Sequence, residues 1–571
     1  EAVSKGAASF FSGNLKSGLL FVQFCLTITK TSVIYTNVNN YLNINIIKLV
    51  FMSHYKYLRD MKKQYLKPVF KSYNQRQMML LPPSLDELIE ENHPVRIVNQ
   101  VLDSVDDRVL VKQYKGGGTS SYHPRMLLKV MVYSYLCNIY SSRKMETALK
   151  ENIHFMWLSG MNRPDHNTLN RFRSEKLKDV LKEIFSQVVM MLADSGHISL
   201  KDVYVDGTKI EANANKFTFV WGNSIKTNKI KMAQQLNELW AYTQKVAQEE
   251  LGDDSPTDFT PIDPQKVEET IARIDEALKG KEVSKEVRQK LNYARKAWPE
   301  NLRRYKAQED LLDGRKSYSK TDPDATFMRM KEDYMNNGLL KPGYNLQIST
   351  NNQFILAYSL HQNTTDTITL ASHLEQFKDT CGQYPEVITA DAGYGSEENY
   401  RLLEEKEIEA YVKYNYFDRD QSKKVVRSPF RLENMPYDAK TDSYKCPGGR
   451  EIKNIGSRNR NSDNGYTQTY RIYQATDCEG CVLKDQCSKK GNNRIFEINH
   501  QLNLYKARAN AMLNSEEGLY HRSKRPVDVE PVFGNIKHNK GFKRFNLRGR
   551  KKVEVETGLL ALAHNLKKVA A

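Results

Sequence analysis

Between residues 199 and 414 the sequence alternates strand-like with helix-like patterns, and this order restricts the fold more than any other feature. The segment SLKDVYVD (199–206) is β-branched and alternates apolar with polar residues, which predicts a strand ending at Asp206. Four more strands are predicted at 342–350, 353–360, 386–391 and 409–414, and two helices at 365–379 and 397–407. The predicted order is therefore β, a long insertion, β, β, α, β, α, β.

Three antiparallel strands followed by βαβ units is the order of an RNase H-like sheet. We therefore predict an α/β core of this fold, a mixed sheet flanked by helices, over residues 199–415. The first and fourth strands are parallel neighbours in that topology, so the ends of these strands bring Asp206 and Asp391 close together. A Gly follows each Asp by one or two residues, which allows a sharp turn and close approach of a substrate backbone.

A third acidic residue, Glu530, falls in a helix predicted at 527–542. This helix has one apolar stripe at positions i, i+3, i+4 and i+7, made of Val529, Val532, Phe533 and Ile536. Glu530, Gly534 and Lys537 lie on another face. The helix can therefore pack on a core and still present a carboxylate and a cation to a ligand.

Three carboxylates on one sheet and one helix suit divalent metal chemistry. Mg²⁺ prefers oxygen ligands and is usually held by a few carboxylates with waters and phosphate. Two such ions stabilise the attacking and the leaving oxygen of an in-line phosphoryl displacement. An isolated Asp at a strand end is most often a cap or turn residue, so the prediction depends on the ordered set of Asp206, Asp391 and Glu530.

Two helical regions flank the first strand. Residues 67–195 have helical patterns and contain RPDHNTLNRFRSEKL, where Asp165 or Asn167 can cap a short helix that exposes Arg171 and Arg173. A basic helix after a tight turn is compatible with helix-turn-helix DNA binding, and an ordinary solvated helix face is the alternative. Residues 226–312 are strongly charged, and their coiled-coil-like stripe predicts an inserted helical hairpin or small bundle.

Four of the seven cysteines cluster in an insertion predicted at 416–512. Cys478 and Cys481 have the CxxC spacing of a zinc knuckle, and Cys487 and Cys446 supply two further thiolates. Four sulfurs suit tetrahedral Zn²⁺, which would fold a loop-rich insertion that lacks a large core. The pattern favours structural zinc, with an iron–sulfur cluster and unmetallated thiols as alternatives.

The net charge of +18 and the pI near 9.2 favour a polyanionic partner such as nucleic acid, with a merely basic soluble protein as the alternative. Residues 537–552 contain eight Lys or Arg and no acid, next to Glu530. Such a run would contact phosphates of a nucleic acid bound beside Glu530. The predicted DNA-binding residues are Arg171, Arg173, Arg522, Arg525, Lys540, Lys543, Arg544 and Arg548.

Residues 1–60 differ in composition from the rest of the chain. From Ala2 to Arg59 there is no Asp or Glu, and Asn, Ile, Tyr, Phe, Leu and Lys are frequent. We interpret the segment as translated upstream sequence of an AT-rich genome, with the start at Met52 or Met61, in preference to an N-terminal module. Its apolar run from Ser17 to Thr29 is too short to span a bilayer.

The motifs VDGTKIEANA, ADAGYGSEENY and VEPVFGNIK resemble the three catalytic motifs of bacterial insertion-sequence DDE transposases. The similarity is to the superfamily that groups the insertion-sequence-four and -five types. RPDHNTLNRFR resembles their N-terminal domain, and the Cys-containing insertion makes the insertion-sequence eleven-eighty-two branch the closest match. The resemblance covers residues 67–568, with 513–571 as the C-terminal part of the catalytic core.

The resemblance implies a metal-binding triad of Asp206, Asp391 and Glu530, followed by Lys537. Related enzymes also place a Tyr and an Arg before the Glu; here those positions are Ser523 and Pro526, with Tyr520, Arg522 and Arg525 nearby. The implied cofactors are two Mg²⁺ or Mn²⁺ ions. The implied partners are double-stranded DNA, both transposon ends and target, and a second copy of the chain. We expect a cytoplasmic enzyme at the bacterial nucleoid, with no membrane contact.

The function expected from this resemblance is transposition. Such an enzyme binds terminal inverted repeats, hydrolyses a phosphodiester to free a 3′-OH, and joins that hydroxyl to target DNA. One alternative is a metal-dependent nuclease of the same fold without strand transfer. The other is a non-catalytic DNA-binding protein in which the three acids are structural.

Overall fold

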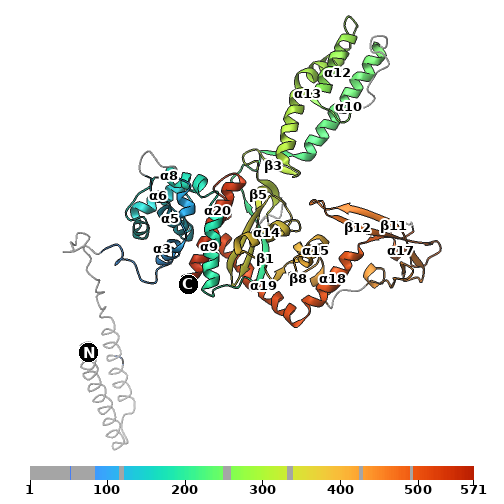
Figure 1. Ribbon diagram of the computed structural model, residues 1–571. Coiled ribbons are helices and arrows are strands. Elements are labelled where there is room, and N and C mark those ends of the chain that lie inside the picture. Colours follow the sequence, from blue (N-terminus) through green and yellow to red (C-terminus); the bar gives the residue numbers. More distant parts are fainter. Residues whose placement is uncertain are drawn as a thin grey trace, which may run out of the picture. The chain divides into compact units, whose positions relative to one another are not determined.

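The computed structural model describes residues 84–114, 121–247, 259–330, 338–422, 428–488 and 493–571, together with Met52 (Figure 1). The chain divides into two units, Glu1–Pro82 and Pro83–Ala571, and the second unit holds the fold described below. The interpretation of residues 1–60 as upstream sequence lies outside the described residues, apart from Met52.

A six-stranded mixed sheet forms the centre of the second unit. β1 (Asp202–Glu211) pairs antiparallel with β5 (Leu340–Asn351) and parallel with β7 (Val387–Ala390), which in turn pairs parallel with β8 (Glu409–Val412). β6 (Phe354–His361) and the short β4 (Thr326–Arg329) share the other edge of β5. The order β6-β5-β1-β7-β8 is the predicted RNase H-like order, to which β4 is an addition.

Successive side chains of a strand point to opposite faces of the sheet, and helices cover both faces. On one face, His373 of α14 (Leu370–Cys381) lies 2.8 Å from Ser349 Oγ of β5 and 2.7 Å from Ser359 Oγ of β6. α15 (Glu397–Glu405) packs beside α14, after the short helix η2 (Ala392–Tyr394). α14 begins at Leu370, five residues later than the sequence predicts. The turn before it carries Asp366, which is described below with the candidate site.

The opposite face is covered by α19 (Glu516–Gly534) and α20 (Arg550–Val569). Asp528 of α19 accepts a 2.6 Å hydrogen bond from Thr350 Oγ1, while Gly558 of α20 lies against the Tyr358 hydroxyl. α20 is buried along most of its length. η4 (Asn535–Asn539) continues directly from α19.

The residues before β1 are helical in the described ranges, as predicted. The helices are α3 (Pro94–Ser104), α4 (Arg108–Val111), α5 (Pro124–Leu136), α6 (Ser142–Glu151), α7 (Ile153–Leu158), α8 (His166–Arg171), η1 (Phe172–Lys176) and α9 (Leu181–Asp194). α5 is buried nearly all round and contacts α20, which joins these helices to the core of the sheet. Asp165 caps α8 by accepting from Thr168 N at 2.9 Å.

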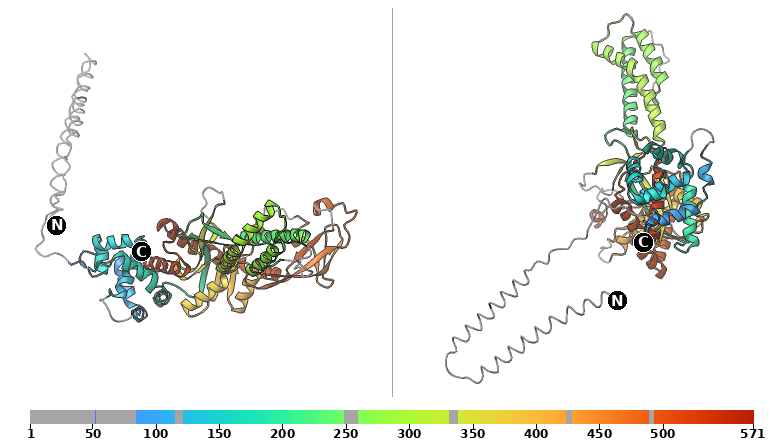
Figure 2. Two further views of the ribbon diagram at one scale, coloured as in Figure 1. Left: turned by 90° about the horizontal axis from the view of Figure 1, so that it is seen from above. Right: turned by 90° about the vertical axis from the view of Figure 1, so that its left-hand side faces the viewer.

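A helical segment with its own core leaves the sheet through the two-stranded pair of β2 (Phe219–Trp221) and β3 (Ser317–Ser319). It consists of α10 (Gly222–Val246), α12 (Pro264–Ala277) and α13 (Lys285–Leu312), which lie side by side in all three views (Figures 1 and 2). The predicted stripe on α12 is buried among Trp240, Trp298 and their neighbours. A separate core means that this segment needs little support from the sheet.

A second, smaller sheet lies between β8 and α19 in the sequence. Its order is β13-β12-β11-β10-β9, formed by β9 (Tyr437–Asp438), β10 (Ser443–Lys445), β11 (Glu451–Asn461), β12 (Thr467–Ala475) and β13 (Ile495–Ile498). The short helices are α16 (Phe417–Asp420), η3 (Leu432–Asn434) and α17 (Lys484–Cys487), and α18 (His500–Leu513) leads to α19. β11 and β12 extend beyond their neighbours as a two-stranded ribbon.

Candidate active site

Parallel pairing of β1 with β7 brings Asp206 and Asp391 together. Val205 pairs with Ala390, so the next residue on each strand is one of the two aspartates. β7 ends at Ala390, and Asp391 caps η2 by accepting from Gly393 N at 2.8 Å. Asp206 therefore lies at the carboxyl end of the parallel pair, as predicted from the strand order.

The prediction that the first strand ends at Asp206 was wrong. β1 continues for five residues to Glu211, because residues 207–211 pair with Gln347–Gly343 of β5 after β7 has ended. At Asp206, β1 is still paired with β5 on one side, whereas its pairing with β7 on the other side has ended at Val205. The candidate site lies where β1 extends beyond the end of β7.

The third carboxylate comes from α19, which begins at Glu516 and runs through Pro526 and Pro531 to Gly534. Ser515 caps it by accepting from Gly518 N at 3.0 Å. The apolar stripe predicted from the sequence is buried, which seats the helix on the sheet. Glu530 lies off this stripe and is half-exposed, on the side of Asp206.

A single guanidinium joins the three acids. Arg525 Nη2 lies 3.2 Å from Asp206 Oδ2 and 3.8 Å from Asp391 Oδ2, and Arg525 Nη1 lies 3.5 Å from Glu530 Oε1. The Arg525 side chain is only 15% exposed. Carboxylates that share one cation must converge, so the three acids predicted from distant motifs form one cluster.

The cluster opens into a cavity of about 330 Å³. Its lining includes the three acids and Arg525, and it is completed by Thr208, Phe533, Gly534, Lys537 and His538. Lys537 was predicted on the same helix face as Glu530, and both border this cavity. Three carboxylates beside the cations of Arg525 and Lys537 suit a phosphodiester whose charge is balanced by metal ions.

The donor set fits hard divalent cations. Three carboxylates supply the oxygen ligands that Mg²⁺ and Mn²⁺ prefer. In their present positions, no three His, Cys, Asp or Glu side chains of the described residues are arranged to hold an ion. The guanidinium of Arg525 lies between the carboxylates and balances part of their negative charge.

Sequence reasoning missed a polar network beneath the Asp391 loop. Asp366, in the turn before α14, accepts from Asn345 Nδ2 at 2.7 Å and Gln347 Nε2 at 2.8 Å, and Tyr394 Oη donates to Gln347. Burial and the charges of Asp366, Asp206 and Asp391 raise the pKa of Tyr394 well above its usual value, so its hydroxyl remains a donor. Two amide side chains at alternate positions of one strand, Asn345 and Gln347, were the signal available in the sequence.

Gly207 is needed for close packing, not for a turn as predicted. A Cβ at this position would lie 2.3 Å from Gln347 Nε2 and 2.7 Å from Asp366 Oδ1. Its backbone is part of the extended strand β1. Gly207 therefore lets the Asp366 network approach the strand that carries Asp206.

Among the predicted DNA-binding residues of the N-terminal helices, Arg171 is exposed and Arg173 is not. Arg173 is 3% exposed and its Nη1 donates to Tyr140 O at 2.7 Å and Tyr135 Oη at 3.2 Å. It also lies 4.0 Å from the buried Glu556 of α20. The prediction of an exposed arginine was wrong because η1 turns this side chain into the junction between α5 and α20.

The basic residues near Glu530 also differ in exposure. Arg522 donates to Leu513 O at 3.1 Å and lies over the ring of Phe417, so it holds the α18–α19 junction. Lys540 was predicted to contact DNA, yet it is 3% exposed. Lys543 is exposed, while Arg544 and Arg548, also exposed, donate to backbone carbonyls of the loop after β1.

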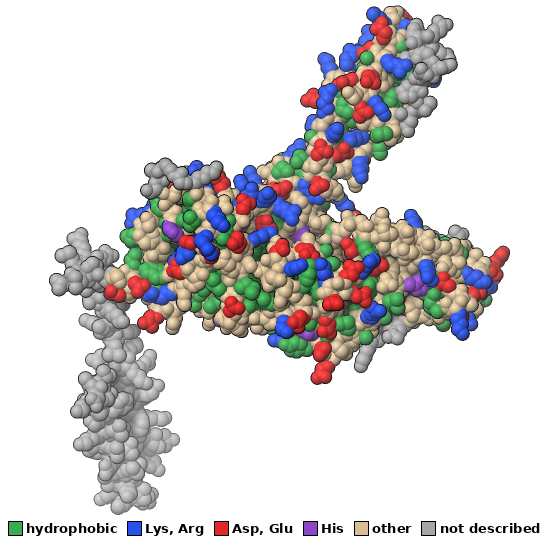
Figure 3. Space-filling view, viewed as in Figure 1, with side chains coloured by type: hydrophobic (Ala, Val, Ile, Leu, Met, Phe, Trp, Pro, Cys, Tyr) green, Lys and Arg blue, Asp and Glu red, His purple; other side chains and the backbone are tan. Residues whose placement is uncertain are grey.

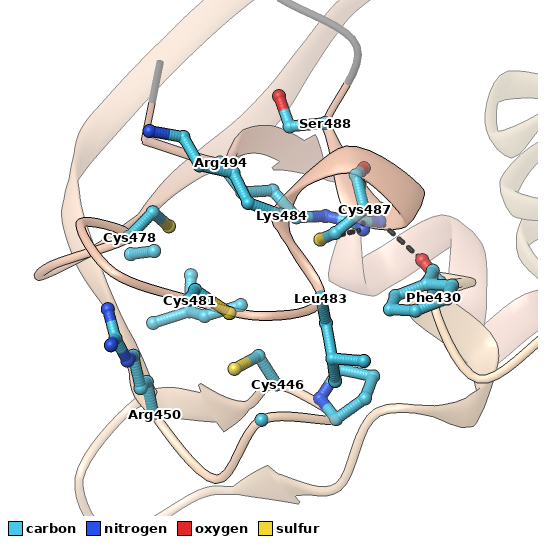
Figure 4. A pocket seen from close by; sticks show the side chains of 14 residues that line it. Phe430, Cys446, Arg450, Cys478, Cys481, Leu483, Lys484, Cys487, Ser488 and Arg494 are labelled. Carbon is cyan, nitrogen blue, oxygen red and sulfur yellow. Dashed lines mark hydrogen bonds between the residues drawn. The ribbon is translucent and has the colours of Figure 1, made fainter. Parts of the chain in front are cut away.

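The four clustered cysteines border one small cavity. Figure 4 shows the sulfurs of Cys446, Cys478, Cys481 and Cys487 around its centre. All four are free cysteines, and their described positions, like those of the three carboxylates, do not form a metal-binding group. Separately, none of the helices in the described ranges combines the length and apolar character needed to cross a bilayer.

Two parts of the chain match known protein families. Residues 83–175 match a family described as "Transposase domain (DUF772)", and residues 445–570 match one described as "Transposase DDE domain". The second match includes Glu530, Lys537 and the four clustered cysteines, whereas Asp206 and Asp391 lie outside both. No curated protein matches the chain. Together with the fold, the two matches support a DDE transposase family, whose members act on DNA.

Proposed function

We propose that this protein is the transposase of an insertion sequence, in the insertion-sequence four/five-like superfamily and nearest to the eleven-eighty-two branch. It binds the terminal inverted repeats, cleaves the DNA to free a 3′-OH, and joins that hydroxyl to target DNA. The observation that carries the proposal is the convergence of Asp206, Asp391 and Glu530 on Arg525. It acts on the DNA of the bacterial nucleoid.

The three carboxylates would hold two Mg²⁺ or Mn²⁺ ions, and we assign Asp206 to both, Asp391 to one and Glu530 to the other. Such ions stabilise charge on the attacking and leaving oxygens of a phosphoryl displacement. Lys537, which borders the same cavity, steadies a phosphate. The Asp366 network contacts the Asp391 loop through the hydrogen bond from Tyr394 to Gln347, so this carboxylate is already ordered before the reaction.

DNA contacts extend from the cavity over the basic segment 537–552. Lys543, Arg544 and Arg548 are exposed on this segment, which runs beside the end of β1 because Phe545 N donates to Glu211 O at 2.9 Å. Arg171 supplies a further exposed cation on the N-terminal helices. Two transposon ends must be paired for transposition, so we propose that two copies of the chain act together on DNA.

The test is a reaction of purified full-length protein with DNA that carries the element's terminal inverted repeats, in Mg²⁺ or Mn²⁺. We expect cleavage at the repeat ends and joined products with target DNA. Asp206→Asn, Asp391→Asn and Glu530→Gln should each lower the cleavage rate by more than about 100-fold, since even the partners of metal ligands contribute 10–100-fold. Binding to the repeat DNA should be retained in all three variants.

Glu386→Gln is the matched control, because Glu386 is an exposed carboxylate at the opposite end of β7, paired with Lys201. It should cleave like the wild type. Cleavage without joined products would favour the nuclease alternative. Repeat binding with no cleavage in either metal, with or without the three acids, would favour the non-catalytic alternative.

A further inference from the structure

The Cys-containing sheet has a very small apolar core. Six buried side chains form it: Met435, Tyr444, Ile452, Tyr473, Ala475 and Ile498. The loops at one end of this sheet, which contain Cys446, Cys478, Cys481 and Cys487, have no apolar cluster of their own in the described residues. Small units of this kind usually need a cross-link or a metal to remain ordered.

The four sulfurs come from three separate segments that meet at one cavity (Figure 4). Cys446 follows β10, Cys478 and Cys481 follow β12, and Cys487 ends α17. A Cβ on Gly448 would lie 3.6 Å from Cys481 Sγ and 3.7 Å from Cys446 Sγ, so sulfurs of two segments flank one glycine. The cavity between them, about 30 Å³, has room for one small species.

Two tight turns aim these sulfurs inward. In the first, Gly449 N donates to Cys446 O at 2.8 Å and Cys446 N donates to Arg450 O at 2.9 Å, with Gly449 at φ +76°. In the second, Gly480 at φ +63° lies between Cys478 and Cys481. Glycine adopts this left-handed conformation without strain, which lets each turn present its cysteine on the inner side.

Basic groups surround the sulfurs. Arg494 Nη1 donates to Cys487 Sγ at 2.9 Å, and a guanidinium can only donate, so this sulfur acts as an acceptor. Arg450 and Lys484 also line the cavity. Four thiolates around one divalent cation would leave a net negative charge, which these basic groups would offset.

We infer that Cys446, Cys478, Cys481 and Cys487 bind one Zn²⁺ ion, which ties together the base of the β11–β12 ribbon. Zinc with four thiolates is a closed structural site and leaves no position for a substrate. Binding would release the thiol protons that remain.

The β11–β12 ribbon links the proposed zinc site to the end of the main sheet that carries the candidate active site. Its tip contacts α15, the helix after the Asp391 loop: Tyr466 Oη donates to Glu397 Oε1 at 3.0 Å, and Asn464 Nδ2 donates to Glu398 Oε1 at 3.0 Å. Zinc at the base of the ribbon and these contacts at its tip therefore hold the same two strands at both ends. Loss of zinc should loosen the ribbon before it affects the main sheet.

The first experiment measures zinc and iron in tag-free, full-length protein by inductively coupled plasma mass spectrometry. We expect ~1 zinc per chain, as one four-thiolate site requires. Cys446→Ser and Cys481→Ser should each lower the zinc content of the folded protein by roughly 10-fold or more. Cys137→Ser is the control, since Cys137 is an exposed free cysteine on the N-terminal helices, and it should keep its zinc.

The second experiment needs no variant and so does not depend on their folding. A mercurial titrates the thiols of the wild-type protein while a chromogenic chelator reports released zinc, and release should be complete after ~4 clustered thiols have reacted. Protease cleavage between residues 454 and 470 should become faster by about 10-fold as the zinc leaves.

Each other outcome overturns the proposal. Iron with a visible charge-transfer band would identify an iron–sulfur cluster instead. Metal-free protein with four freely reactive thiols would show that the cysteines bind nothing. Zinc that survives both Cys→Ser variants would place the ion elsewhere in the chain.

Discussion

Arg525 is the central residue of the candidate site. Its guanidinium contacts all three acids, and its Nε atom is buried with no hydrogen-bond partner in the described residues. The cation therefore offsets the mutual repulsion of three carboxylates when no metal ion does so. Arg525 lies one residue before Pro526, the position at which the resemblance to related enzymes places an arginine.

This arrangement makes the stability of an Arg525→Ala variant dependent on metal. In EDTA we expect the free energy of unfolding to fall by about 1–3 kcal/mol, because the partly buried carboxylates lose their counter-ion. Mg²⁺ should restore most of this loss, since the ion binds only the folded protein. Thermal unfolding with EDTA and with Mg²⁺ measures both effects.

Arg401→Ala is the control, because Arg401 pairs with Glu405 on the surface of α15, and in each of the two solutions it should unfold like the wild type. An Arg525→Ala protein that Mg²⁺ does not stabilise would contradict the assignment of these carboxylates as a metal site.

Lys540 shows the opposite situation, a buried cation whose Nζ lacks a hydrogen-bond partner among the described residues. Burial, with a smaller effect of Lys567, lowers the pKa of Lys540 to about 8. The charged form is thus disfavoured in the folded protein. The free-energy cost of burying the charged lysine is fully present below pH 8. It disappears as the pH rises toward 10.5, the ordinary pKa of lysine.

Lys540→Met should therefore stabilise the protein at pH 7, by on the order of 3 kcal/mol at most. Its advantage should shrink as the pH is raised from 8 to 10, because the wild-type lysine becomes neutral in the folded state. Urea unfolding of both proteins at pH 7 and pH 10 gives the comparison. An advantage of equal size at both pH values would show that the effect comes from packing and not from charge.

At the scale of the element, the basic segment 537–552 is not a uniform surface. Lys537 borders the cavity of the candidate site, Lys540 is buried, and Lys543 is exposed. This variation arises because the segment turns from η4 into an extended run that pairs with Glu211 of β1. A count of charges therefore overstates how many of these residues can reach a phosphate.

Lys543 and Lys540 form a matched pair for DNA binding. Lys543→Ala should reduce the slope of log K against log salt by about 0.9, as the loss of one phosphate contact does. Lys540→Met should leave the slope unchanged, because a buried side chain neutralises no phosphate. Binding to repeat DNA over a range of salt concentrations measures both. Equal effects of the two substitutions would refute the distinction drawn from burial.

At the scale of the whole molecule, positive charge is unevenly distributed. Residues 1–82 contain eleven Lys or Arg and two Asp or Glu, so this unit carries half of the net charge of +18. The helical segment 226–312 contains sixteen of each sign and is neutral, and Figure 3 shows both kinds interspersed over it. Long-range attraction of DNA therefore does not come from this segment.

Excision of residues 230–308 with a short linker tests that conclusion. Lys229 and Glu309, the flanking residues, form a 2.5 Å ion pair, so the cut ends of α10 and α13 are adjacent. Because the excised part has its own core, the remaining protein should lose no more than about 1 kcal/mol of stability. The salt slope for repeat DNA should be unchanged. A slope that falls by one or more would place phosphate contacts on the excised helices.

The strand order, the helical segment and the three acids could be predicted from the sequence because these depend on local patterns. Period-two alternation identifies a strand wherever it lies, and the RNase H-like order then requires the first and fourth strands to be neighbours. The apolar stripe of α19 likewise set the face on which Glu530 lies. For these features each residue's own neighbours in the chain carry the information.

Only the tertiary structure decided what depends on distant segments. β1 continues past Asp206 because β5 pairs with it, Arg173 is buried because Tyr135 and Glu556 meet it, and Arg525 reaches three acids from three elements. Asp366 entered the site for the same reason, through amide groups on another strand. Burial and charge pairing are properties of the assembled fold, since the partners lie far apart along the chain.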